Sequence, residues 1–139
     1  MTAQALEIVE GLSGTAEGQR SLRAAAPTLT GNLVRCARSP ALSRAALTAL
    51  VNVSQDAAIA AALVDGAACP KLFDYLREGA LAHPDLAVML LSNLTQSEKG
   101  ARSALQVRTG HALPTVAASL VRRVHSRSGS AGAARKKAK

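Results

Sequence analysis

Residues 47–55 read LTALVNVSQ, and residues 88–96 read VMLLSNLTQ. The two stretches align without a gap, so that Asn52 and Asn93 fall at equivalent positions 41 residues apart. In each stretch a polar asparagine interrupts an apolar run of the kind that a buried helix carries. A period in the low forties with helical patterning is typical of armadillo or HEAT repeats, whose units bury their apolar faces by stacking on one another.

The repetition extends to the sequence around these two stretches. Four positions that follow the first stretch recur 44 residues later: Gly66, Pro70, Leu72 and Leu76 correspond to Gly110, Pro114, Val116 and Leu120. An insertion of three residues near 106–109 accounts for the longer spacing. A weaker copy upstream contains Leu22, Pro27, Leu29 and Leu33. We therefore expect an all-α fold, a right-handed armadillo-like α-solenoid of about three repeats.

The composition favours helices over strands. Hydrophobic residues make up 48% of the chain but aromatic residues only 1%, with no Trp. Ala and Leu supply most of the apolar share and are strong helix formers, whereas sheets draw on β-branched and aromatic residues. The 139 residues are enough for one domain with a core. A β-propeller has repeats of similar length but needs strands and aromatic signatures, so the composition excludes it.

Proline, glycine and capping residues predict where the helices begin and end. Pro40 and Pro84 each follow a polar residue and predict the starts of two long helices, which end at about Ser54 and Thr95. Turn residues at 55–56 and 97–98 then begin two shorter helices. After breaks at Gly66 and Gly110, an amphipathic helix at about residues 69–79 completes a three-helix unit, with Leu72, Phe73 and Leu76 facing inward.

The positive charge lies in the last part of the chain. Residues 1–98 hold seven basic and nine acidic side chains, whereas residues 99–139 hold ten basic and no acidic ones. We predict a repeat domain over residues 1–121 and a basic, disordered tail over residues 122–139, because Ser, Gly, Ala, Arg and Lys cannot form a core.

The tail carries seven basic side chains that could bind phosphates: Arg122, Arg123, Arg127, Arg135, Lys136, Lys137 and Lys139. They could contact nucleic acid or a membrane surface through phosphates, or serve as a nuclear import signal. No aromatic residue stands among them, so such binding would be sensitive to salt and blind to sequence. The simpler interpretation is a solvated tail.

Two interpretations of the repeated asparagine stay open. In a solenoid, Asn52 and Asn93 would lie about one repeat apart on a concave surface and could bond the main chain of an extended peptide. Arg44 and Gln96 are neighbouring candidates for contact with such a partner. Alternatively, each asparagine is structural and bonds the carbonyl groups that a helix terminus leaves open.

No residue pattern indicates catalysis, a cofactor or a metal site. The three His residues are scattered, and Cys36 and Cys69 are too far apart to form a C-x-x-C pair. The sequence has no apolar run long enough to cross a membrane and no basic and apolar leader at its start. We therefore expect a cytoplasmic protein without enzymatic activity and with two buried, reduced thiols. A nuclear location stays open.

Two further stretches carry a family resemblance. Residues 66–76, GAACPKLFDYL, are similar to the second-helix signature of armadillo repeats, and residues 90–95, LLSNLT, are similar to the third-helix signature. The pairing of residues 46–56 with residues 88–95 most resembles the N-terminal region of the Hgh family. These eukaryotic armadillo-like proteins are adaptors that help the cytosolic chaperonin and Hsp90 fold translation elongation factor 2. The resemblance spans about residues 5–105.

The resemblance implies a protein-binding scaffold, a chaperone adaptor for translation elongation factor 2. Importin-α and β-catenin grooves place Trp near the repeated asparagine, but Thr48 and Met89 stand here, so import cargo is not expected. Hgh-family chains are longer, which implies that this chain is a fragment or a truncated form. The alternative is a ribosome-associated or nucleic-acid-associated protein that acts through its basic end.

Overall fold

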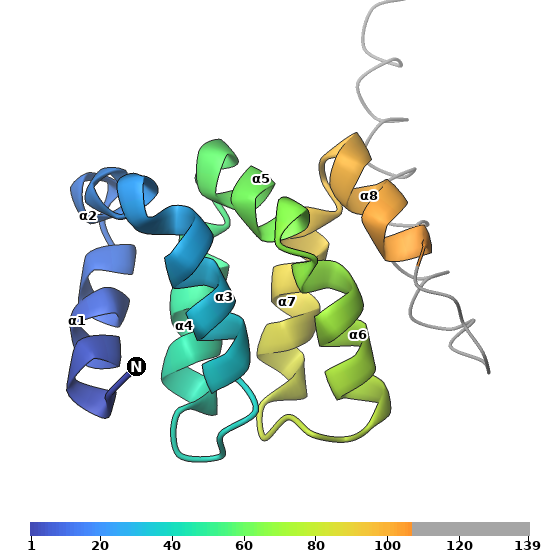
Figure 1. Cartoon of the computed structure of the whole chain (residues 1–139), viewed down its shortest axis with the longest axis horizontal. Helices are drawn as coiled ribbons and strands as arrows, with labels where there is room; N and C mark the ends of the chain where they lie inside the picture. The colour runs from blue at the N-terminus through green and yellow to red at the C-terminus, as the bar shows by residue number, and fades with distance from the viewer. Residues whose placement is uncertain (107–139) are drawn as a thin grey trace, which may run out of the picture. The chain divides into compact units, whose positions relative to one another are not determined.

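The computed structural model describes residues 1–106, which form eight α-helices, one short 3-10 helix and no strand (Figure 1). The prediction of an all-α fold is confirmed for this part of the chain. The predicted tail and the predicted boundary at residue 121 lie outside the described residues. The helices are α1 (Ala3–Ser13), α2 (Ala16–Leu22), the 3-10 helix η1 (Arg23–Ala25), α3 (Ala26–Cys36), α4 (Ser43–Val53), α5 (Ala57–Asp65), α6 (Ala68–Arg77), α7 (Pro84–Leu94) and α8 (Glu98–Leu105).

The helices recur in space as the sequence recurs. Helices α1, α4 and α7 begin 40 and 41 residues apart, and α4 packs against both of the others, so that the three form a row (Figure 1). In the same way α6 packs against α3, and α8 packs against α5. Helices α4, α6, α7 and α8 therefore each lie on their counterpart in the preceding set.

The short helices after the row begin with matching caps. The side chains of Thr15, Asp56 and Ser97 accept hydrogen bonds from backbone N–H groups in the first turns of α2, α5 and α8. Such caps satisfy donors that a helix start leaves open. The predicted helix starts after Asp56 and Ser97 are confirmed.

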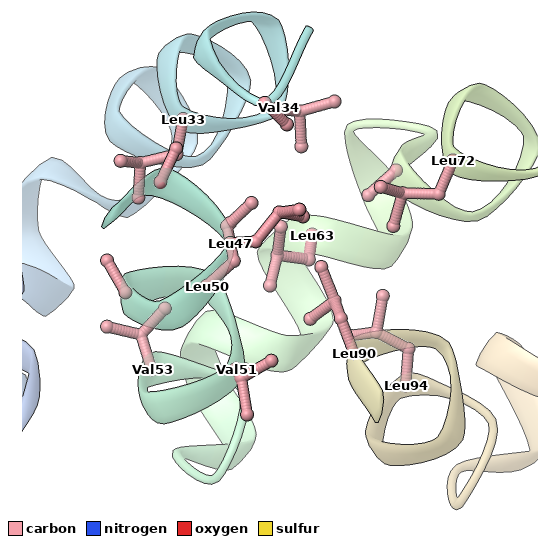
Figure 2. Close-up of a cluster of buried hydrophobic side chains, with 14 of the residues drawn as sticks. Leu33, Val34, Leu47, Leu50, Val51, Val53, Leu63, Leu72, Leu90 and Leu94 are labelled. Atoms are coloured by element: carbon pink, nitrogen blue, oxygen red, sulfur yellow. The ribbon is translucent and has the colours of Figure 1, made fainter. Parts of the chain in front are cut away.

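The core is made of aliphatic side chains from the middle helices. Figure 2 shows Leu47, Leu50, Leu63, Leu90 and Leu94 meeting between α4, α5 and α7, and each of them is at most 1% exposed. Burying one such side chain contributes about 1.5–3 kcal/mol. Leucines at helical spacing thus hold the row and the short helices together, and an aromatic core is not needed.

Two helix boundaries and one buried position differ from the prediction. Helix α4 begins at Ser43 instead of Pro40, because the backbone N–H groups of Leu42 and Ser43 both bond the carbonyl oxygen of Ser39, at 2.9 and 2.7 Å, and close a turn first. Helix α6 spans Ala68–Arg77, with Leu72 and Phe73 buried but Leu76 only half-buried.

The break between α5 and α6 also has an unexpected backbone. Gly66 ends α5 with an ordinary φ of −77°, and it is Ala67 that adopts the left-handed conformation, with φ of 58°. A left-handed alanine costs roughly 1–2 kcal/mol. The glycine marks the break correctly, but the turn places its strained residue one position later.

The two thiols have different surroundings. Cys69 is buried and Cys36 is half-buried, and neither forms a disulfide. The prediction of two buried thiols is therefore correct for Cys69 and wrong for Cys36. Burial raises the pKa of the Cys69 thiol above its usual value. Within the described part of the chain, no helix is both long enough and apolar enough to cross a membrane.

Candidate protein-binding surface

The row of α1, α4 and α7 carries the candidate residues. Asn52 and Asn93 are each the last but one residue of their helix and are half-buried, so they lie at the same level in neighbouring helices. Gln96 is exposed close to Asn93, and its backbone N–H donates to the Asn93 carbonyl oxygen at 3.3 Å. Arg44 is exposed at the other end of α4, about 12 Å along the helix from Asn52. The structure thus groups Asn52, Asn93 and Gln96 but not Arg44.

Both asparagine side chains bond the preceding helix of the row. Nδ2 of Asn52 donates to Oγ of Ser13 at 3.2 Å, and Nδ2 of Asn93 donates to Oγ of Ser54 at 2.8 Å. Ser13 and Ser54 are themselves equivalent positions, at the ends of α1 and α4. We call these two contacts the Asn–Ser bridges.

The serines of the Asn–Ser bridges also cap their own helices. The hydroxyl of Ser13 donates to the Glu10 carbonyl oxygen at 2.7 Å, and that of Ser54 donates to the Val51 carbonyl oxygen at 2.7 Å. Each hydroxyl therefore accepts one hydrogen bond from the asparagine and donates one to the backbone of its own helix. Thr95 at the end of α7 bonds the Leu91 carbonyl in the same manner, at 2.8 Å.

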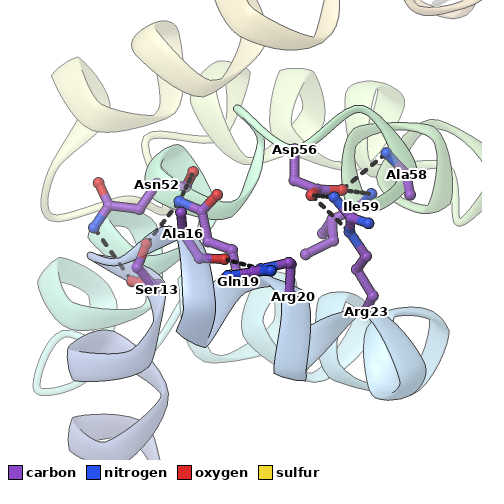
Figure 3. A network of polar contacts seen from close by, with 9 residues as sticks. All are labelled: Ser13, Ala16, Gln19, Arg20, Arg23, Asn52, Asp56, Ala58 and Ile59. Atoms are coloured by element: carbon purple, nitrogen blue, oxygen red, sulfur yellow. Dashed lines mark hydrogen bonds and ion pairs between the residues drawn. The ribbon is translucent and has the colours of Figure 1, made fainter.

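A glutamine supplements the first bridge, as Figure 3 shows. Nε2 of Gln19 donates to the carbonyl oxygen of Ser13 at 2.9 Å and to that of Asn52 at 3.1 Å. These carbonyls belong to the ends of α1 and α4, and that of Asn52 also accepts from the backbone N–H of Gln55 at 3.2 Å. Gln19, and not the Asn52 side chain, thus bonds the carbonyl groups at these two helix ends, while Asn93 reaches the Val51 carbonyl at 3.4 Å.

A buried carboxylate joins the 3-10 helix η1 to α5. Oδ2 of Asp56 accepts from Nε of Arg23 at 2.7 Å, and its other oxygen accepts from the backbone N–H groups of Ala58 and Ile59 at 3.0 and 3.2 Å (Figure 3). The Arg23 hydrogen bonds hold the pKa of Asp56 below its ordinary value, and the two backbone donors act in the same direction against the effect of burial.

The side-chain oxygens of the two asparagines differ from the side-chain nitrogens in their hydrogen bonding. Among the described residues, no donor bonds Oδ1 of Asn52 or Asn93, although both amide nitrogens contribute to the Asn–Ser bridges. A half-buried carbonyl at the same level of two adjacent helices can accept from the backbone N–H groups of a partner. The structural and the binding interpretations of these residues are therefore compatible.

A second equivalent position lines the same row one turn earlier. Glu7, Thr48 and Met89 correspond in α1, α4 and α7, and Met89 is 52% exposed. The row therefore presents an acid, a hydroxyl and a flexible thioether instead of a Trp ladder. Exposed Met side chains adapt to different apolar partners.

The sequence analysis did not identify the partners of the asparagines. Ser54 and Thr95 stand two residues after the asparagines within the aligned stretches, so their repetition was a usable signal. Gln19, Arg23 and Ser13 lie in the weakest copy and could not be paired with residues 33 or 39 positions away. The basic residues of the predicted tail, from Arg122 onward, lie outside the described residues.

Residues 1–106 contain no cluster of three His, Cys, Asp or Glu side chains that could hold a metal ion. No protein family, curated protein or solved structure matches this chain.

Proposed function

We propose that this chain is a non-catalytic protein-binding scaffold whose helices form a right-handed, armadillo-like α-solenoid of about three repeats. The observation that carries the proposal is the Asn–Ser bridge, which recurs with the same atoms between α1 and α4 and between α4 and α7. Recurring contacts between equivalent positions are what stacked repeats require.

The binding surface of this scaffold is the row of α1, α4 and α7 around Asn52 and Asn93. The two asparagine oxygens accept from successive main-chain N–H groups of an extended segment of the partner, and Gln96 and Met89 add contacts beside them. This use of the surface is supported by the half-buried position of both amides and by the lack of a donor to either oxygen within residues 1–106. Arg44 would contact only a segment long enough to reach the other end of α4.

The proposed client is translation elongation factor 2, with the cytosolic chaperonin and Hsp90 as further partners. This part of the proposal is supported by the resemblance of residues 46–56 and 88–95 to the Hgh family. In that role the chain is a fragment or truncated form of an adaptor, located in the cytoplasm.

The test is the affinity of the chain for purified elongation factor 2, measured by isothermal titration calorimetry. We expect the double variant Asn52→Ala, Asn93→Ala to bind at least about ten-fold more weakly, which corresponds to about 1.4 kcal/mol. The matched control is Ser13→Ala, Ser54→Ala, which breaks the same bridges but keeps both asparagine oxygens.

The control separates the binding role from the structural role. If both double variants lose affinity equally, the bridges act only by holding the helices in place. Unchanged affinity in the asparagine variant, with a cooperative helical melt, would exclude the proposed ladder. No measurable affinity in the unaltered chain would exclude elongation factor 2 as the client.

The charge distribution supports a second candidate, a nucleic-acid-associated or ribosome-associated protein. Residues 99–139 hold ten basic and no acidic side chains. Binding to RNA through these residues would weaken steeply between low and physiological salt and would be lost when residues 122–139 are removed. Binding through the helical row would survive both changes, so one salt titration with and without the tail distinguishes the two functions.

A further inference from the structure

Two glutamines repeat beside the two asparagines of the row. Gln55 and Gln96 each stand three residues after an asparagine, at equivalent positions 41 residues apart. The backbone N–H of each donates to the carbonyl oxygen of its asparagine, at 3.2 Å from Gln55 and at 3.3 Å from Gln96. Both side chains are exposed, and neither bonds another described residue, unlike the side chain of Gln19. We call Gln55 and Gln96 the glutamine pair.

The exposure of this surface is a property of the row itself. Helix α4 has a neighbour on each side, α1 and α7. Even so, Asn52 at its end is half-buried and Gln55 is exposed, and the same holds for Asn93 and Gln96 after α7. A position that stays open beside a helix flanked on both sides belongs to the face of the row and not to an interface between its helices.

The asparagines supply acceptors to this face but few donors. Nδ2 of Asn93 donates to Oγ of Ser54 at 2.8 Å and to the Val51 carbonyl oxygen at 3.4 Å, which occupies both of its hydrogens. Nδ2 of Asn52 is likewise turned to the preceding helix, through Ser13. The main chain of a partner carries a C=O as well as an N–H, and a C=O that loses water without a new donor costs free energy. The exposed glutamine amides, each with two N–H donors, supply that donor.

The two helices that carry these amides present almost no charge. Residues 48–55 read TALVNVSQ and residues 89–96 read MLLSNLTQ, without a Lys, Arg, Asp or Glu. The charged residues of α4 and α7 are Arg44 and Asp85, eight positions before the asparagines and about 12 Å from them along the helices. A charged side chain that packed beside the amides would lose water without gaining a counter-ion.

The charged residues that follow the glutamine pair are already paired. Asp56 is buried and bonds Arg23. Glu98, at the start of α8, forms an ion pair with Arg102 of the same helix. Neither carboxylate offers an uncompensated charge to a partner, so the face favours a segment with uncharged side chains.

The contact is confined to α4 and α7. Gly11 and Gly14 stand at the positions of α1 that correspond to Asn52 and Gln55, so α1 supplies no amide. Neighbouring helices lie about 8–10 Å apart, and an extended chain advances about 3.3 Å per residue. About three residues of a partner therefore separate the amides of α4 from those of α7, and a segment of about six residues covers both.

We propose that the row recognises the main chain of an extended, uncharged segment of a partner protein through two kinds of amide. The glutamine pair donates to the C=O groups of the segment, and Oδ1 of the asparagines accepts from its N–H groups. This inference rests on the proposed function, in which the row binds an extended segment. It adds that the glutamine pair determines affinity, and that charged residues and proline, which lacks an N–H, are excluded from the contacted part.

Random peptides displayed on phage test the proposal without a known client. Peptides of about 12 residues, long enough to cross the row at about 3.3 Å per residue, are selected on the full 139-residue chain. We expect the enriched peptides to share an uncharged stretch without proline. The affinity of the enriched peptides for the chain and its variants is then measured by fluorescence polarisation.

The donors are removed in the double variant Gln55→Glu, Gln96→Glu, which keeps the side-chain length and the acceptors. We expect it to bind the peptides at least about ten-fold more weakly, as should Gln55→Ala with Gln96→Ala. The matched control is Gln4→Glu with Gln106→Glu, which makes the same charge change at two exposed glutamines outside residues 48–55 and 89–96 and should leave affinity unchanged. All four positions are exposed, and circular dichroism checks that the helices persist.

The outcomes separate this inference from the proposed function. Affinity that is lost in Asn52→Ala with Asn93→Ala but kept in the glutamate variant would overturn the inference and leave the proposed function in place. A shared stretch rich in charged residues would also overturn the inference alone. If no peptide is enriched, or if neither the asparagine nor the glutamine substitutions change affinity, both the inference and the proposed binding surface are excluded.

Discussion

The α1–α4 and α4–α7 contacts are two versions of one interface. Both contain an Asn–Ser bridge, with Asn52 in the first and Asn93 in the second. The first adds polar contacts from Gln19, and close to it Arg23 of η1 pairs with the buried carboxylate of Asp56 at the start of α5. The second has fully buried leucines on α7, and the nearby ion pair of Lys99 with Asp65 is exposed. The bridge is thus the constant part of the interface, and its surroundings vary.

The largest expected effect compares equivalent apolar positions at the two ends of the row. Leu90→Ala removes a fully buried side chain, and we expect it to lower the free energy of unfolding by about 2–5 kcal/mol. Ile8→Ala alters the same position of α1, which is open, and should change stability by no more than about 0.5 kcal/mol in dilute solution. Urea denaturation of both variants measures the difference. Equal losses would show that Ile8 is buried to the same extent as Leu90, which would contradict the difference in exposure.

The next effect concerns the sharp turns that leave α1 and α7. A Cβ at Gly18 would lie 2.0 Å from the carbonyl oxygen of Leu12, and one at Gly100 would lie 1.9 Å from that of Leu94. Because these are backbone atoms, Gly18→Ala and Gly100→Ala should each cost about 1–3 kcal/mol. The control Gly31→Ala, where nothing lies within 4 Å, should be neutral or stabilising. Thermal melts rank the three variants, and tolerance of both alanines would contradict the close approach.

A double-mutant cycle compares the Asn–Ser bridges directly. Asn93→Ala, Ser54→Ala and their combination should reveal a coupling free energy of about 0.5–1.5 kcal/mol, typical of one hydrogen bond. The cycle of Asn52 with Ser13 should give a similar or smaller value, because its bridge is longer, 3.2 against 2.8 Å. Additive losses in the Asn93 cycle would mean that the bridge contributes nothing to the interface.

The smallest effect is a pH dependence of the Arg23–Asp56 pair, which lies beside the first interface, between η1 and α5. The pKa of Asp56 is lower in the folded chain than in the unfolded one, so its contribution is present above the unfolded pKa and is lost as pH falls through the folded pKa. Stability should therefore decline below about pH 4 more steeply in the unaltered chain than in Asp56→Asn. The expected difference is at most about 1 kcal/mol, since Arg23 is 52% exposed. Parallel acid titrations followed by circular dichroism measure it.

The sequence predicted the elements whose signals are local. The aligned stretches at 47–55 and 88–96 predicted two equivalent helices, and Asp56 and Ser97 predicted the caps of the helices that follow. The equivalence of Asn52 and Asn93 was also readable from their spacing. Helical periodicity and capping depend on residues a few positions apart, so a single sequence contains them.

Contacts between distant residues came from the tertiary structure. Neither the pairing of Asn52 with Ser13 nor that of Arg23 with Asp56 has a local signal, because each joins residues more than 30 positions apart. The sequence also did not determine which equivalent positions are buried. Ile8 and Leu90 are both aliphatic residues on one helix face, yet Ile8 is exposed and Leu90 is buried. An apolar stripe indicates that a helix can be covered, whereas the neighbour that covers it depends on how the whole chain packs.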